Sequence, residues 1–391
     1  MQVSVNISSD MLKWIVSQAS SYGFSDTVRD YLEKWQNGNA PTFNQIEKVS
    51  KSTGIPLGYF FLQKPPVENI TLVNYRTIDS EQLSNPSRNL IDTLHDMDLV
   101  QEWVREYQIA NGNLPCAFVG LFKNETKYTT IAENIRNLLN IKIDWYNQTK
   151  TVEESFNFLR AAISNLGVVV MMNGVVGNNT HRPLDIEEFR AFAVVDEYAP
   201  LIFINANDSI NGRLFSLVHE FVHICKGENS LYNDMVYVEH TVQPIEILCN
   251  AVAAEILVPH NVFITEWNNT VINQDNLIFN IDQIAKKFKC GTMVIARRAY
   301  DNGFIDYSTY QQICKTAINS YNRNRKKKKE EGGGGDYYKT LASRLDRRFL
   351  DMVVGSVRSG TMQYTDAFRL TNTSRATFDV LIQKISGGVK K

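Results

Sequence analysis

Asn211-Gly-Arg-Leu-Phe-Ser-Leu-Val-His-Glu-Phe-Val-His223 is a stretch in which apolar residues surround two histidines and a glutamate. The apolar pattern predicts a helix with packing faces. Residues four apart lie on the same side of a helix, one turn from each other. His219 and His223 can therefore bind one metal ion at about 2 Å from each nitrogen. Glu220 follows the first histidine, where its carboxylate can reach a metal-bound water and act as the general base.

A catalytic zinc ion needs a third protein ligand and an open coordination position. The next predicted helix starts at Pro244, covers residues 245–257, ends at Val258-Pro259 and carries Glu246 among apolar residues. We expect Glu246 to be the third ligand, with Asn250 one turn further along as a hydrogen-bonding helper. Glu246 can also be explained as a first-turn carboxylate that the helix dipole favours. Three residues are rival third ligands: Glu239, His240 and Glu255.

Strand patterns precede these two helices. They cover residues 167–172, 189–195 and 200–205, and only Asp196-Glu-Tyr-Ala199 separates the last two. Such a short connection predicts a hairpin. The expected fold class is α+β, with a small antiparallel or mixed sheet packed on the H-E-x-x-H helix and all-α modules on either side.

The order of these elements, with N-G-R-L-F-S-L-V-H-E-F-V-H and E-I-L-C-N-A-V-A-A-E-I-L-V-P, resembles the ImmA/IrrE family of metallopeptidases. In that family a glutamate ligand precedes an A-N or C-N pair and an A-A-E-x-L-x-P ending, which Glu246, Asn250 and residues 253–255 match. The resemblance covers roughly residues 130–265. It implies zinc, a gluzincin-like site and a regulatory protease that cuts a repressor or antitoxin.

Composition sets limits on the class of protein. The hydrophobic fraction of 43% and the charged fraction of 21% predict a folded protein, and 391 residues suggest several domains. A net charge of −1 gives no global attraction to nucleic acid or to a membrane surface. Five scattered cysteines favour a reducing compartment. We find no signal-peptide pattern and no apolar stretch of membrane-spanning length, so we expect a cytoplasmic protein.

Changes in pattern divide the chain into six predicted segments. They are an XRE-like helical module (1–65), a helical connector (66–130), the zinc metallopeptidase domain (131–265), a helical extension (266–322), a flexible charged and glycine-rich linker (323–336) and a small helical C-terminal module (337–391). An extended piece is expected at residues 70–75. The short sequence Tyr364-Thr-Asp-Ala-Phe368 resembles helical domains that end some toxin–antitoxin-linked relatives.

Two stretches have a helix-turn-helix pattern. Residues 35–62 resemble the back half of an XRE-type domain, but residues 1–65 hold six basic and five acidic residues and so predict no basic face. DNA binding there stays open beside docking on a partner or on the peptidase. Residues 281–305 contain the best basic patch, and we favour a helical face that closes the peptidase domain. The patch consists of Lys286, Lys287, Lys289, Arg297 and Arg298.

Two functions follow. The first is a site-specific zinc endopeptidase that controls a regulator in a phage, stress or toxin–antitoxin setting. The second is a DNA-binding transcription regulator or antitoxin-like protein, with a toxin partner, that uses the peptidase fold as a sensing module. An intact Glu220 favours the first, because a binding module has no need of a general base. A zinc site that only stabilises the fold is a third interpretation.

The sequence offers several candidates for the groups that bind the substrate. A sheet edge within residues 189–195 is expected to hold the substrate as an added strand. The oxyanion needs a hydrogen-bond donor. The candidates are Tyr232, Tyr237, His240 and His260. His95 and His181 are expected at the surface, and the cysteines need no special role.

Overall fold

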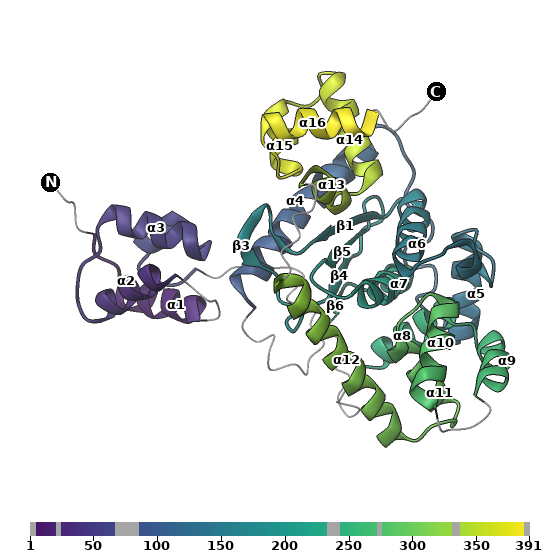
Figure 1. Cartoon of the computed structure of the whole chain (residues 1–391). Helices are drawn as coiled ribbons and strands as arrows, with labels where there is room; N and C mark the ends of the chain where they lie inside the picture. Colours follow the sequence, from purple (N-terminus) through teal and green to yellow (C-terminus); the bar gives the residue numbers. More distant parts are fainter. Residues whose placement is uncertain are drawn as a thin grey trace. The chain divides into compact units, whose positions relative to one another are not determined.

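The computed structural model describes residues 5–20, 25–66, 86–232, 243–271, 276–330 and 337–386 (Figure 1). The predicted extended piece at residues 70–75 lies outside these ranges. Two compact units are present. The first contains residues 1–74, 81–96 and 175–184, and the second contains the remainder of the chain.

The N-terminal part of the first unit is helical, as the sequence predicted. It consists of α1 (Ser9–Ser20), α2 (Asp26–Gln36), α3 (Phe43–Thr53) and the 3-10 helix η1 (Leu57–Phe61). Thr42 and Gln45 form a reciprocal capping box at the start of α3, and Gly54 ends the helix with a φ of 75°. Buried side chains such as Ile15, Trp35 and Phe60 form its core. The same unit contains the hairpin of β2 (Val175–Val176) and β3 (Asn179–Pro183).

A four-stranded mixed sheet organises the second unit. Its strand order is β1 (Val169–Asn173), β5 (Leu201–Asn205), β4 (Ala191–Val194) and β6 (Ser230–Tyr232). The strands β4 and β5 form the predicted antiparallel hairpin, and β1 runs parallel to β5. All residues of β4 and β5 are buried, and all except Asn205 are apolar, so neither strand alternates between apolar and polar residues. The observed fold class is α+β, as predicted.

One apolar core joins the sheet to helices from a long stretch of chain. Ile202 and Ile204 of β5 share it with Leu217 and Phe221 of the central helix. The helices that contribute to this core are α5 (Tyr128–Leu138), α6 (Val152–Leu166), α7 (Ile210–Lys226), α8 (Pro244–Leu257), α9 (His260–Thr270), α10 (Leu277–Phe288), α11 (Thr292–Asp301) and α12 (Tyr307–Glu330). The boundaries predicted at 130 and 265 therefore fall inside a single core.

The predicted linker differs from the structure in its first part. Helix α12 continues to Glu330, so residues 323–330 are helical instead of flexible. Lysine and arginine are good helix formers, and α12 starts well before the basic run, so the run extends an existing helix. Residues 331–336 lie outside the described ranges.

The C-terminal module is helical, as predicted, and consists of α13 (Tyr337–Arg344), α14 (Arg347–Arg358), α15 (Tyr364–Leu370) and α16 (Arg375–Ser386). It is anchored at β1, where the Arg160 guanidinium donates to the carbonyls of Ser343 and Leu345, and Asp346 accepts from the backbone of Val170. The long helix α4 (Arg88–Ala110) also contacts it, through the Trp103–Phe349 ring pair.

Among the described residues, no single helix is long and apolar enough to cross a membrane, although α8 and α9 pass that test as a pair bent by 63°.

All five cysteines are free. Burial raises the pKa of the Cys225 and Cys290 thiols, so both are poor nucleophiles. His95 and His181 are exposed, as the sequence predicted.

Candidate metal centre

The helix α7 is held at both ends and buried along most of its length. The Ser209 side chain accepts from the Gly212 amide at its start, and Gly227 ends it with a φ of 76°. Apolar residues on several faces pack into the core, which fixes the rotation of the helix about its axis. His219, Glu220 and His223 are each at most 1% exposed. The helix therefore presents three polar side chains inside the protein.

Helix α8 brings the third group to these histidines. Pro244 occupies its first turn, and Glu246 follows in the same turn. The small or apolar residues Cys249, Val252 and Ala253 are buried in the shared core, which lets α8 lie close to α7. The Glu246 carboxylate lies 3.1 Å from His219 Nε2 and 3.3 Å from His223 Nε2. Glu246, which the sequence predicts as the third ligand, therefore lies beside both histidines.

The three groups form a compact triangle. The two Nε2 atoms are 3.1 Å apart, and all three ligand atoms lie within 4.8 Å of one another. In a tetrahedral site with bonds of about 2.0–2.1 Å, neighbouring ligand atoms are about 3.3–3.4 Å apart. The triangle is close to one face of such a tetrahedron, so these residues fit a zinc ion with its fourth position open.

Charge in the cluster also suits a cation. Burial raises the pKa of Glu246, but the hydrogen bonds with His219 and His223 lower it further, and the net pKa falls well below the usual value. Burial lowers the pKa of His223, whereas hydrogen bonds with Cys249 and Glu246 raise it above its usual value. The carboxylate is thus ionised, and metal binding would release a proton from the imidazole.

Glu220 is positioned beside the three candidate ligands and not among them. Its Oε2 atom accepts a hydrogen bond from the Ser230 hydroxyl, whereas its Oε1 atom is buried without a hydrogen-bond partner in the described part of the chain. Burial raises the pKa of Glu220, and the nearby histidines oppose that shift. One oxygen is therefore anchored and the other is free to bind a water molecule.

Two site residues come from β6. Ser230 was missed by sequence reasoning, because a lone serine after a helix carries no signal. Tyr232 was one of four oxyanion candidates. Its ring packs on the His219 imidazole with the ring centroids 4.1 Å apart. Of the other candidates, Tyr237 and His240 lie outside the described residues, as does the rival ligand Glu239.

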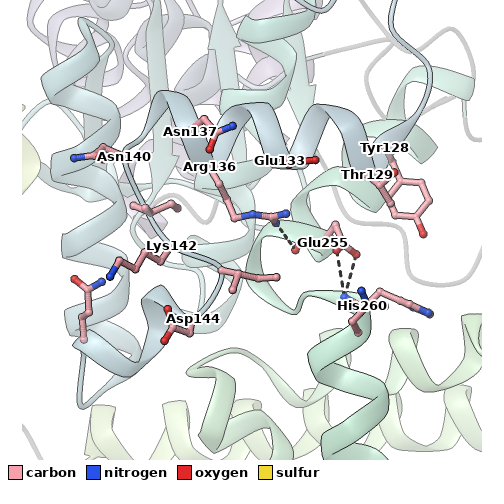
Figure 2. A pocket seen from close by; sticks show the side chains of 14 residues that line it. Tyr128, Thr129, Glu133, Arg136, Asn137, Asn140, Lys142, Asp144, Glu255 and His260 are labelled. Atoms are coloured by element: carbon pink, nitrogen blue, oxygen red, sulfur yellow. Dashed lines mark hydrogen bonds between the residues drawn. The ribbon is translucent and has the colours of Figure 1, made fainter.

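His260 lies in a different place. It lines a pocket of about 1090 Å³ between α5, residues 140–148 and the junction of α8 with α9 (Figure 2). Neither His219 nor His223 nor Glu246 lines that pocket. The structure therefore gives no support to His260 as an oxyanion donor.

The predicted substrate edge is wrong as stated. Strand β4, within residues 189–195, pairs with β5 on one side and with β6 on the other. It is an inner strand and has no free edge. Among the described residues, β6 forms the edge of the sheet on the side of the metal centre. A three-residue strand is too short to be detected from alternation.

Asn250, the predicted helper, lies on α8 one turn after Glu246. Its Oδ1 atom is buried and makes no hydrogen bond to a described residue. The Nδ1 atoms of both histidines are also buried without partners of normal geometry. The Cys249 thiol lies against His223, and its pKa is raised by burial. The supporting role of Asn250 remains a prediction.

Comparison with known families agrees with this geometry. Residues 163–300 match the model of the IrrE N-terminal-like domain of the M78 peptidases. The matched segment includes the sheet, α7, α8 and the helices to α11, and it supports a place in the ImmA/IrrE family and a metallopeptidase-type function. Residues 345–384 match a separate domain of unknown function, DUF8813. No curated protein and no solved structure matches the chain.

Glu255, a rival third ligand, has a different partner within the matched segment. Its carboxylate pairs with Arg298 of α11 at 2.6 Å and accepts from the His260 amide. Arg298 also donates to the Val258 carbonyl. The ion pair joins the end of α8 to α11, so Arg298 is not part of a surface patch. Two other residues of the predicted basic patch are paired as well, Lys287 with Glu266 and Arg297 with Asp301.

This buried ion pair predicts a large effect on stability. Replacing Glu255 by alanine leaves the Arg298 cation buried and unpaired, which is expected to lower the free energy of unfolding by about 3–5 kcal/mol. Urea unfolding of the full chain measures the change. The matched control is Asp301→Ala, which breaks the exposed pair with Arg297 and should cost less than about 1 kcal/mol. Equal effects of the two variants would contradict a structural role for Glu255.

Proposed function

We propose that this chain is a zinc-dependent endopeptidase with a gluzincin-like centre at His219, His223 and Glu246. Its substrate in this proposal is a protein regulator, such as a repressor or antitoxin, cut at a specific site. The observation that carries the proposal is the triangle of three ligand atoms beside a buried carboxylate with one free oxygen. A site that only stabilises the fold has no use for that carboxylate.

The residues supply the parts of a hydrolytic reaction. A zinc ion at the three ligands would polarise a water molecule and the scissile carbonyl. Glu220 accepts the proton of the attacking water at Oε1 and passes it to the leaving amine. Ser230 holds the other oxygen, which fixes the direction in which Glu220 points. Tyr232 packs on the His219 ring and limits its rotation.

Strand β6 offers a place for the substrate backbone. The Tyr232 carbonyl accepts from the Arg190 amide, so it points toward β4. Backbone groups alternate sides along a strand, and those of Leu231 therefore point away from β4. A substrate in extended conformation can add to this edge by hydrogen bonds to Leu231. Such docking places a peptide beside His219, because Tyr232 is the next residue.

Burial supports a selective enzyme over a digestive one. His219, Glu220 and His223 are almost fully buried, and the Glu246 side chain is only 15% exposed. A substrate must reach a site that is closed to most of the solvent. Only a chain segment that fits this approach would be cut, which agrees with a single regulator as substrate.

The test compares new protein N-termini in cells that express the wild type or the Glu220→Gln variant. We expect one or a few proteins to gain a terminus with the wild type alone, because glutamine cannot accept the proton. The matched control is Glu228→Gln, which makes the same change at an exposed position after α7 and should behave as the wild type. Identical lists from wild type and Glu220→Gln, under inducing stress and with zinc bound, would favour a binding module over a peptidase.

A further inference from the structure

The C-terminal module contains two consecutive helices with the proportions of a DNA-reading motif. Helix α15 has seven residues, a turn of four residues follows, and α16 has twelve residues. A helix-turn-helix joins two helices by a turn of three or four residues, and its second helix enters the major groove. We propose that residues 363–383 form a helix-turn-helix that binds double-stranded DNA through α16.

The turn is built by local hydrogen bonds. Asn372 has a φ of 51°, a conformation that asparagine tolerates better than most residues. The Thr373 amide donates to the Phe368 carbonyl, and the Thr371 hydroxyl donates to the Ala367 carbonyl. Ser374 then starts α16, with its hydroxyl accepting from the Thr377 amide. These bonds fix the point at which the second helix leaves the first.

A small core holds the two helices together. Ala367, Phe378 and Leu381 are fully buried. The Phe378 ring lies edge-on to those of Phe368 and Tyr364, with centroids 5.5 and 6.4 Å away. A residue as small as Ala367 at this point lets α15 and α16 approach closely. The angle of α16 is therefore set by packing and not by a flexible loop.

The opposite side of α16 is exposed and polar. Arg375, Ala376, Asp379 and Gln383 are spaced by one, three and four residues, which places them on one face, and all are exposed. Arginine binds guanine edges, glutamine binds adenine edges, and aspartate accepts from cytosine. Arg369 and Arg375 are exposed and form no ion pair with a described residue. Both are available for phosphate or base contacts.

The module docks through other residues. Asp346 and Arg348 contact the backbone of the peptidase part, at Val170 and Ser164, and both lie at the start of α14. Figure 1 shows α13 next to β1, with α15 and α16 farther from the sheet. The contacts between the C-terminal module and the peptidase part, at Val170 and Ser164, therefore leave the exposed face of α16 uncovered.

Charge along the chain favours DNA as the partner. Residues 337–386, which form the C-terminal module, contain 8 basic and 4 acidic residues, whereas the rest of the chain contains 33 basic and 38 acidic residues. A net charge of −1 for the whole chain hides this asymmetry. A basic segment attracts phosphates by counterion release. By contrast, the basic patch predicted within residues 281–305 is largely neutralised by ion pairs.

The test uses the full-length protein and a library of short duplexes with a random centre. Duplexes retained by the protein are sequenced after several rounds, and the affinity for the enriched site is measured by fluorescence anisotropy over a range of salt concentrations. We expect one enriched sequence and an affinity that falls steeply with salt. Single-stranded DNA of the same sequence should bind more weakly.

Substitutions locate the contact. Arg375→Ala should weaken binding to the enriched site by about 5- to 100-fold and relax sequence preference. Arg369→Ala should weaken binding to all duplexes alike. It should also reduce by about 1 the slope of log affinity against log salt concentration. The matched control is Arg29→Ala, an exposed arginine in the N-terminal helical module, which should leave binding unchanged. Circular dichroism checks that each variant is folded.

Three results would overturn the proposal. The first is no duplex binding at low salt by the folded full chain. The second is a loss of binding in Arg29→Ala but not in Arg375→Ala, which would place DNA binding in the N-terminal module. The third is equal binding of duplexes, single strands and heparin with no enriched sequence, which would reduce the segment to a general polyanion-binding surface.

Discussion

Replacing Glu220 by glutamine is expected to slow peptide-bond cleavage by about 100- to 10,000-fold while zinc stays bound. Glutamine keeps the shape of the side chain and can still accept from the Ser230 hydroxyl. It cannot take a proton from the attacking water at the position of Oε1. The rate is measured with the purified protein and a peptide that spans the cleavage site found in cells.

Two comparisons make this result specific. Glu228→Gln changes the same group at an exposed position and should keep the wild-type rate. Ser230→Ala removes the hydroxyl that anchors Oε2 and should reduce kcat less than Glu220→Gln does, because the base itself remains. An unchanged rate in Glu220→Gln would contradict the role of this carboxylate as the base.

Removing one metal ligand is expected to abolish zinc binding. Losing a residue that only supports a ligand typically weakens metal binding by about 10- to 100-fold, and losing a ligand should cost more. His223→Ala and Glu246→Ala each leave two protein ligands of the three. The zinc content per chain, measured by atomic emission after dialysis, should fall from about one to near zero.

Controls separate ligand loss from a general loss of structure. Glu228→Ala removes an exposed glutamate and should keep the wild-type zinc content. Asn250→Ala tests the predicted helper, and a 10- to 100-fold weaker affinity is the effect of a residue that supports a ligand. Full zinc content in Glu246→Ala would show that the third ligand lies elsewhere, with Glu239 and His240 as the first residues to test.

The cluster of His219, His223 and Glu246 was predictable because its geometry is local. His219 and His223 are on one helix, where the spacing alone places them together. Glu246 is in the first turn of the next helix and has apolar neighbours on both sides. Ser230 was not predictable, because its contact with Glu220 depends on the chain reversing after Gly227 and pairing with β4. Sheet pairing over such a distance has no local signal.

Two other predictions failed for physical reasons. The strand that contains residues 191–194 is an inner strand because β6 pairs with it, and β6 is too short to recognise in the sequence. The charged run after Arg323 was predicted to be a flexible tether. Its residues instead continue α12, because lysine favours the helical conformation. The XRE-like identity of residues 1–65 stays a prediction, since only their helical character is confirmed.

The most direct test of the account is X-ray absorption at the zinc edge, recorded on the full-length protein as purified. The account predicts about one zinc per chain, with nitrogen and oxygen ligands at about 2.0–2.2 Å and the outer-shell signal of two imidazoles. Glu220→Gln should give the same protein ligands. A sulfur ligand at about 2.3 Å, which would point to Cys249, or zinc bound without imidazoles, would contradict the centre proposed at His219, His223 and Glu246.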